Sequence, residues 1–219
     1  MMPANLLSLH AEEEKLRAMA IALVQSDARS LRHFQIAERA MDLIDVFRQT
    51  RTSDEDLKTI QLLGLRLFNA LASSIKLMLG GYAQTSAQLL RDVLETVFLL
   101  DYFRTNHPAI KQWRDAGPKD MRDQFSPAAV RKALNARDGF SSKRRAAVYS
   151  QFSELAGHPT PKGFAMLRPK GMDAHGGPFL DPTALEAVAS EMGRLAVQGG
   201  EKIIAFCPTN NARLVDTAK

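Results

Sequence analysis

Two adjacent glycines, Gly80 and Gly81, separate two long segments of helical apolar periodicity, residues 54–79 and 82–104. Paired glycines are a strong signal for the end of a helix, because glycine closes a helix C-terminus at little steric cost. Two long helices joined by so short a turn pack against one another as an antiparallel pair. The sequence therefore predicts a central helical hairpin, and this hairpin directs the chain toward an all-α fold.

Helical periodicity also continues on both sides of the hairpin. Apolar residues recur at a spacing close to 3.6 over residues 6–24 and 28–49. Beyond the hairpin, prolines at first-turn positions and serines at caps predict shorter helices. These helices are expected at residues 108–113, 127–136 and 143–156, with a last helix from residue 182 to just before Pro208. Ser53 with Asp56 three residues later resembles a capping box at the start of the hairpin.

A segment rich in proline and glycine, residues 158–180, precedes the last helix. Its composition leaves no room for a regular helix, so we expect a long ordered loop with a short hairpin around residues 164–167. No repeat and no polar linker divides the chain. We therefore predict a single-domain helical bundle over residues 1–208, followed by a frayed C-terminal tail over residues 209–219.

The positive charge of the chain is concentrated in its middle third. The chain has 29 Lys and Arg against 24 Asp and Glu, a net charge of +5. Residues 104–170 hold 14 basic and 5 acidic residues, whereas the segments on either side are each slightly acidic. Basic residues are most concentrated in this segment at positions such as Lys143, Arg144 and Arg145. Such a segment either consists of solvated helix faces or binds the phosphates of RNA or a nucleotide.

The composition excludes several other classes of protein. A single cysteine cannot form an internal disulfide or a thiolate zinc site, and the scattered histidines fit no ligand spacing. We therefore expect no metal and no cofactor. We find no run of about twenty apolar residues and no signal peptide, so we expect a cytoplasmic, bacterial-type protein without a membrane partner. Apolar faces left over on the first two helices would favour a homodimer.

The helix that follows Gly81 is the most informative segment. Its last third is apolar nearly all round, which is typical of a helix buried in the centre of a bundle. Four polar residues share one stripe on it: Gln84, Gln88, Arg91 and Glu95. Arg91 and Glu95 can pair across one helical turn. The pair is either a structural link between helices or part of a functional site.

A second segment places a histidine directly after a helix that ends at glycine. His158 follows Gly157, while Tyr149 and Ser153 lie one turn apart on the preceding helix. A histidine at a helix C-terminus is favoured in its charged form and can serve as an acid, a base or a ligand. The structural alternative is that His158 caps the last carbonyl groups of that helix.

Together, these two segments resemble a large group of uncharacterised bacterial helical proteins. The resemblance rests on a Gly-Tyr-x-x-x-x-Ala-x-x-Leu-x-Arg-x-x-Leu-Glu-like helix, matched by residues 81–95, and on a serine followed by a His-Pro element, matched by Ser153 and His158-Pro159. It covers roughly residues 60–205. The helical layout of the group is similar to that of HEPN proteins (higher eukaryotes and prokaryotes nucleotide-binding), many of which are ribonucleases in toxin or phage-defence systems.

The HEPN resemblance implies a site built from an arginine and a histidine at a helix end. Arg168 and His175 have six residues between them, a formal match to the HEPN spacing, but no helix is expected there. We therefore place the candidate catalytic residues at Arg91, Glu95 and His158. His158 would act on the ribose 2′-hydroxyl, and Arg91 would stabilise the developing phosphorane charge. The candidate binding residues are Tyr82, Gln88, Tyr149, Ser153, Lys143, Arg144 and Arg145.

Three classes of function follow from these observations. The first is a regulatory or interaction module in which the Arg91–Glu95 pair is structural. The second is a HEPN-like ribonuclease that uses Arg91, Glu95 and His158. The third is a protein that binds a nucleotide or small ligand in the same pocket without chemistry. We expect the first and keep the other two as alternatives, so the sequence leaves open whether the protein is an enzyme.

Overall fold

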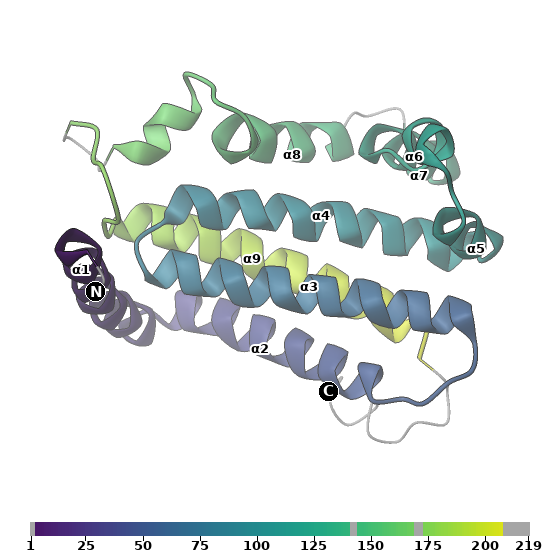
Figure 1. The fold of residues 1–219 in the computed structure, drawn as a ribbon, viewed down its shortest axis with the longest axis horizontal. Coiled ribbons are helices and arrows are strands. Elements are labelled where there is room, and N and C mark those ends of the chain that lie inside the picture. The colour runs from purple at the N-terminus through teal and green to yellow at the C-terminus, as the bar shows by residue number, and fades with distance from the viewer. Residues whose placement is uncertain (1–2, 141–143, 169–172, 208–219) are drawn as a thin grey trace.

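The turn at Gly80-Gly81 joins α3 (Glu55–Leu79) to α4 (Ala83–Thr105), as the sequence predicts. A computed structural model describes residues 3–140, 144–168 and 173–207, and these ranges contain helices and no strand (Figure 1). Gly81 has a φ of +89°, and a Cβ atom there would lie 2.8 Å from the backbone nitrogen of Phe179. Only glycine can adopt this positive φ at little cost and also leave room for the backbone of Phe179. The Gly81 carbonyl accepts a hydrogen bond from that nitrogen, so the turn also anchors the segment before the last helix.

The hairpin packs with α2 (Ala28–Arg48) and α9 (Pro182–Ile204) into a four-helix core (Figure 1). The largest fully buried side chains of this core include Phe47, Ile44, Leu67, Leu71, Leu94 and Phe103. α9 continues unbroken through Gly199, where a Cβ atom would lie 2.5 Å from Leu67 Cδ2. A small residue at this position therefore lets α9 lie close to α3. The all-α, single-domain helical bundle predicted from the sequence is confirmed.

Aspartates cap three of the long helices. The carboxylates of Asp27, Asp54 and Asp181 each accept hydrogen bonds from backbone N–H groups in the first turn that follows. At the start of α3 the cap is Asp54, which accepts from the backbone nitrogens of Asp56 (2.8 Å) and Leu57 (3.4 Å). The predicted capping box starting at Ser53 is wrong, because the Asp54 carboxylate bonds both amides and also favours the positive end of the helix dipole.

One helix among the described residues has a length and composition that would suit a membrane span. Within the described ranges this helix is α3. In the structure it lies in the core, with Leu67 and Leu71 fully buried. The core helix of a bundle meets the same criterion, so the length and composition of α3 do not distinguish a membrane helix from a core helix.

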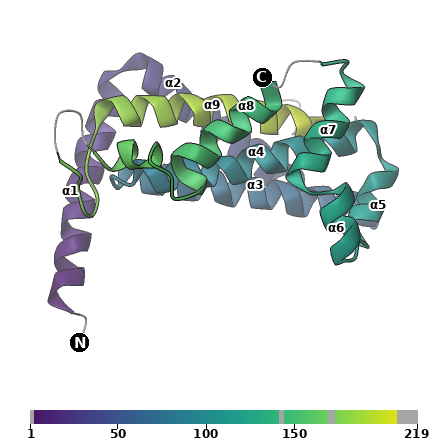
Figure 2. The same ribbon diagram turned by 90° about the horizontal axis from the view of Figure 1, so that it is seen from above.

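Four short helices form an outer layer along α4 (Figures 1 and 2). They are α5 (Pro108–Arg114), α6 (Pro118–Gln124), α7 (Pro127–Arg137) and α8 (Arg144–Phe152). The sequence predicts all of these except α6, because a Gly-Pro pair such as Gly117-Pro118 is also a signal for the end of the preceding helix. Proline is also a favourable first residue of a helix, and Pro118 starts α6 in this way.

One short helical turn precedes the predicted loop of residues 158–180, and a second lies within it. α8 continues into a π-helical turn, Ser153–Gly157, and a 3₁₀ turn follows at Gly163–Leu167. The hairpin expected around residues 164–167 is therefore wrong. Gln84 of α4 stabilises both turns, since its Nε2 donates hydrogen bonds to the carbonyls of Leu155 (3.1 Å) and Gly163 (2.9 Å).

The first helix, α1 (Ala4–Ser26), crosses one end of the bundle and projects beyond it (Figure 2). Tyr82 attaches it by donating a 2.7 Å hydrogen bond to Glu13. Burial, together with this bond to a carboxylate, raises the pKa of Tyr82 to about 12. Large apolar side chains of α1 remain exposed: Leu6, Leu7, Met19, Ile21 and Leu23. The predicted homodimer rests on this surface and stays a prediction.

A buried carboxylate joins the core to the outer layer. Asp101 of α4 is 7% exposed and pairs with Arg137 of α7 (2.9 Å), Arg104 (3.2 Å) and Lys202 of α9 (3.5 Å). Burial raises the pKa of Asp101, but the hydrogen bond from Arg137 and the charge of Lys202 outweigh it, so the pKa lies below its usual value. Asp101 therefore holds three helices together as an anion.

We expect Asp101→Asn to lower the free energy of unfolding by about 3 kcal/mol at neutral pH, because it leaves Arg137 and Lys202 without their counter-charge. Because the folded-state pKa is depressed, this contribution is fully present above the unfolded-state pKa of about 3.9 and is lost as the pH falls through the folded-state value. Urea unfolding followed by circular dichroism at several pH values measures both effects.

The matched control is Asp123→Asn, which removes an exposed carboxylate whose ion-pair partner is Arg122. It should cost no more than about 0.5 kcal/mol. Equal losses in the two variants would contradict the structural role of Asp101.

Candidate functional site

The predicted Arg91–Glu95 pair is present on the outer face of α4. Arg91 Nε donates to Glu95 Oε1 at 3.1 Å, and the two side chains are 22% and 28% exposed. Arg91 Nη2 also donates a 2.5 Å hydrogen bond to the hydroxyl of Tyr149 on α8. The pair is therefore partly desolvated and extends to a third residue, which sequence spacing alone could not show.

Two arginines meet at the ring of Tyr149. The guanidinium carbon of Arg91 lies 4.8 Å from the ring centroid, and that of Arg131 on α7 lies 3.8 Å from it. Such contacts are attractive because the face of an aromatic ring carries partial negative charge. Among the described residues, Arg131 has no ion pair, and its buried Nη1 has no hydrogen-bond partner. We call Arg91, Arg131 and Tyr149 the arginine–tyrosine cluster.

The π-helical turn ends at Gly157, which lies against Arg91 of this cluster, and His158 is the next residue in the chain. A Cβ atom at Gly157 would lie only 2.5 Å from Arg91 Nη1, so the absence of a side chain there makes room for the guanidinium group. His158 follows in extended conformation, with its backbone N–H donating to the Ser153 carbonyl at 2.9 Å. The His158 side chain is exposed, and no hydrogen bond or ion pair to it occurs within the described ranges. The prediction that the His158 side chain caps the helix is therefore wrong, because it is the backbone N–H of His158 that bonds a carbonyl of the last turn.

The other predicted binding residues lie in different surroundings. Ser153 is buried beside α4, and its Oγ has no partner in the described structure. Gln88 is exposed, and Tyr82 lies at the other end of the stripe, bonded to Glu13. Among the described members of the predicted set, side-chain hydrogen bonds join Arg91 to Glu95 and to Tyr149, whereas His158 and Ser153 are joined only through their backbones.

The basic segment divides into paired and unpaired cations. Arg145 binds Asn135 (2.9 Å) and Asp138, so it holds α7 to α8. Within the part of the segment that the structure describes, five cations have no ion pair: Lys119, Arg131, Lys132, Arg144 and Arg168. Lys143 lies outside the described residues. Much of the predicted basic segment is therefore structural, and its unpaired cations are concentrated on α7 and at the start of α8.

Sequence reasoning missed Arg131 and the role of Gly157. Arg131 was noted only as one of many basic residues, and Gly157 only as the end of a helix. Neither periodicity nor a motif could have shown that α7 lies across Tyr149. No group of three or more His, Cys, Asp or Glu side chains that could hold a metal ion is found over residues 3–140, 144–168 and 173–207.

We expect Tyr149→Phe to lower the free energy of unfolding by about 1.5 kcal/mol, because it removes the acceptor of a charged hydrogen bond from a partly buried arginine. Tyr102→Phe is the matched control, since the Tyr102 hydroxyl accepts from the neutral amide of Asn106 at 3.0 Å. It should cost only about 0.5 kcal/mol. Urea unfolding of both variants makes the comparison, and a Tyr149→Phe loss no larger than that of Tyr102→Phe would contradict the interpretation.

Comparison of the chain with protein-family models, with curated proteins and with solved structures finds no match. The similarity to bacterial helical proteins, and through them to HEPN proteins, therefore stays a prediction that rests on residues 81–95, Ser153 and His158-Pro159.

Proposed function

We propose that the protein is a regulatory binding module that recognises a phosphate group of RNA or a nucleotide at the arginine–tyrosine cluster. The observation that carries this proposal is the charge of Arg131, which stacks on Tyr149 and has no ion pair with any residue that the structure describes. Two guanidinium groups meet at one ring, and within the described structure only that of Arg91 pairs with a carboxylate, Glu95. The cluster therefore carries excess positive charge.

The chemistry of the cluster suits a phosphate. A guanidinium group offers planar, paired N–H donors that match phosphate oxygens, and its charge is weakly hydrated. The unpaired cations Lys132 and Arg144 lie on the same outer helices and would add long-range attraction. RNA would be attracted to this surface first through its phosphates, and its exposed bases would contact the surface afterwards.

A HEPN-like ribonuclease is the second candidate. The contact between Arg91 and Gly157 supports it, because it brings the backbone next to His158 against the guanidinium group. In such a reaction His158 would move a proton at the ribose 2′-hydroxyl, and Arg91 would stabilise charge on the phosphorus centre. Over residues 3–140, 144–168 and 173–207 no hydrogen bond or ion pair orients the exposed imidazole, so we rank binding above cleavage.

We expect the protein to bind a short fluorescein-labelled single-stranded RNA, with an affinity that falls steeply between about 50 and 200 mM salt, because phosphate contacts release counterions. Arg131→Gln should weaken binding by about fivefold to tenfold, since it removes one charged contact. Fluorescence anisotropy measures both effects, and a competing mononucleotide tests whether one phosphate suffices.

The matched control is Arg122→Gln, which removes the same charge from an exposed arginine paired with Asp123 on α6. It should change the affinity by less than about twofold. Equal losses in the two variants, or binding that does not respond to salt, would refute a site at Arg131.

The ribonuclease alternative requires a separate test with His158→Ala. Expression of the wild type should arrest growth and degrade RNA if His158 is catalytic, whereas the variant should leave RNA intact. We expect intact RNA with both proteins, as a binding module requires. Cleavage by the wild type alone would overturn this order and establish the enzyme.

A further inference from the structure

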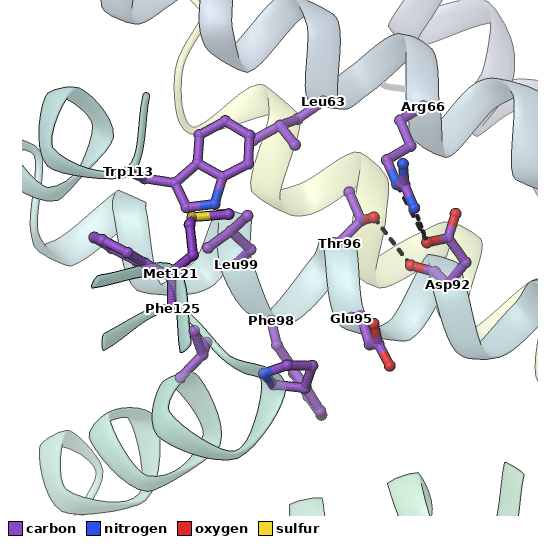
Figure 3. A pocket seen from close by; sticks show the side chains of 12 residues that line it. Leu63, Arg66, Asp92, Glu95, Thr96, Phe98, Leu99, Trp113, Met121 and Phe125 are labelled. Carbon is purple, nitrogen blue, oxygen red and sulfur yellow. Dashed lines mark hydrogen bonds and ion pairs between the residues drawn. The ribbon is translucent and has the colours of Figure 1, made fainter. Parts of the chain in front are cut away.

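A cavity of about 300 Å³ lies between α3, α4 and the outer helices α5 to α7, next to Glu95 but outside the arginine–tyrosine cluster (Figure 3). Most of its lining is apolar and aromatic, including Phe98, Leu99, Trp113, Met121 and Phe125. The Trp113 ring is held edge-on against Phe103, with ring centroids 6.0 Å apart. A cavity of this size and lining is typical of a site for a small organic molecule.

One end of the cavity is charged. Figure 3 shows the Arg66–Asp92 pair at one end and Trp113, Met121 and Phe125 at the other. Asp92 and Glu95 are three residues apart on α4, so their carboxylates lie on the same side of the helix. Two carboxylates and one arginine line this end, while the second arginine, Arg91, pairs with Glu95 from outside the cavity, so the lining itself holds one more negative than positive side chain.

Each of the two carboxylates has an oxygen left over. Arg66 donates from both Nη2 (2.5 Å) and Nε (3.2 Å) to the same atom, Asp92 Oδ1. Arg91 likewise binds Glu95 through Oε1. Within the described residues, Asp92 Oδ2 and Glu95 Oε2 accept no hydrogen bond. They are available acceptors at the mouth of an apolar cavity.

We propose that this cavity binds a small primary amine with an apolar, aromatic body. An ammonium group has three N–H donors and no acceptor, which complements two carboxylate oxygens with free lone pairs. The hydrocarbon body would lie against Phe98, Met121 and Trp113, where its burial is favourable. An anionic ligand would be repelled by the same carboxylates, and a neutral one would gain only from the apolar part. This site takes a cation and does not depend on the phosphate site at Arg131.

Trp113 provides the measurement, because it is the only tryptophan in the chain. The full-length protein is titrated with 2-phenylethylamine, 2-phenylethanol and phenylacetate, none of which absorbs where indole is excited selectively. We expect the amine to change the Trp113 emission with an affinity about tenfold higher than that of the alcohol, and phenylacetate to bind most weakly.

Three variants test the charged end. Asp92→Asn and Glu95→Gln should each weaken binding of the amine by about fivefold while leaving that of the alcohol unchanged. Glu201→Gln is the matched control, since Glu201 is an exposed glutamate on α9 that pairs with no cation in the described part of the chain, and it should change neither affinity. Circular dichroism and urea unfolding confirm that each variant is folded.

The wild-type protein alone can refute the proposal, whatever the variants do. Equal affinities for the amine and the alcohol would show that the carboxylates take no part, and an emission unchanged by all three compounds would show that the cavity binds none of them. Amine affinity that is the same in wild type, Asp92→Asn and Glu95→Gln would also overturn it. No RNA is present in this experiment, so its outcome is separate from that of the phosphate site.

Discussion

The outer face of α4 is the constraint on which the rest of the structure depends. α4 packs on α3 and α9 with one side, so polar side chains on its other side need partners from the outer layer. Gln84 bonds the carbonyls of the two turns after α8, Arg91 bonds Tyr149, and Asp101 pairs with Arg137. A buried or half-buried polar group without such a partner would be costly. These few side chains therefore fix where the outer helices and turns lie, and they place the candidate site at the boundary between core and outer layer.

The need of charged side chains for partners also explains the role of the basic segment, residues 104–170. The net charge over residues 104–170 predicts either solvated helix faces or a phosphate-binding surface, but the structure uses many of these cations internally. Arg137 and Arg145 share Asp138, whose pKa is lowered by the hydrogen bonds from both arginines, with the Arg137 bond contributing most. A cation held by a carboxylate contributes little attraction for a ligand. The charge available for binding is therefore that of unpaired residues, and Arg131 differs from the others because an aromatic ring holds it in place.

The sequence predicts the fold better than it predicts the site, for physical reasons. Periodicity, prolines and the Gly80-Gly81 turn are local signals, and they gave the hairpin, the last helix and most short helices close to their observed bounds. α6 is not predicted, because the same Gly-Pro pair can end one helix and start the next. Within the site, Arg91 with Glu95 is a one-turn pair and was predictable. The contacts of Arg91 with Tyr149 and Gly157, and of Arg131 with Tyr149, join segments far apart in the chain, and no local pattern encodes them.

Glu95 connects the two proposed binding sites. One of its oxygens bonds Arg91 of the arginine–tyrosine cluster, and its side chain also lines the cavity that contains Trp113. An ammonium ion at Glu95 and a phosphate at Arg91 would each weaken the Arg91–Glu95 pair, since each supplies one partner with a new counter-charge. A ligand that releases one member of an ion pair lowers the cost of binding at the other member, and such coupling is reciprocal by thermodynamic necessity. The Arg91–Glu95 pair would then be more than a structural link, because the occupancy of one site would raise the affinity of the other.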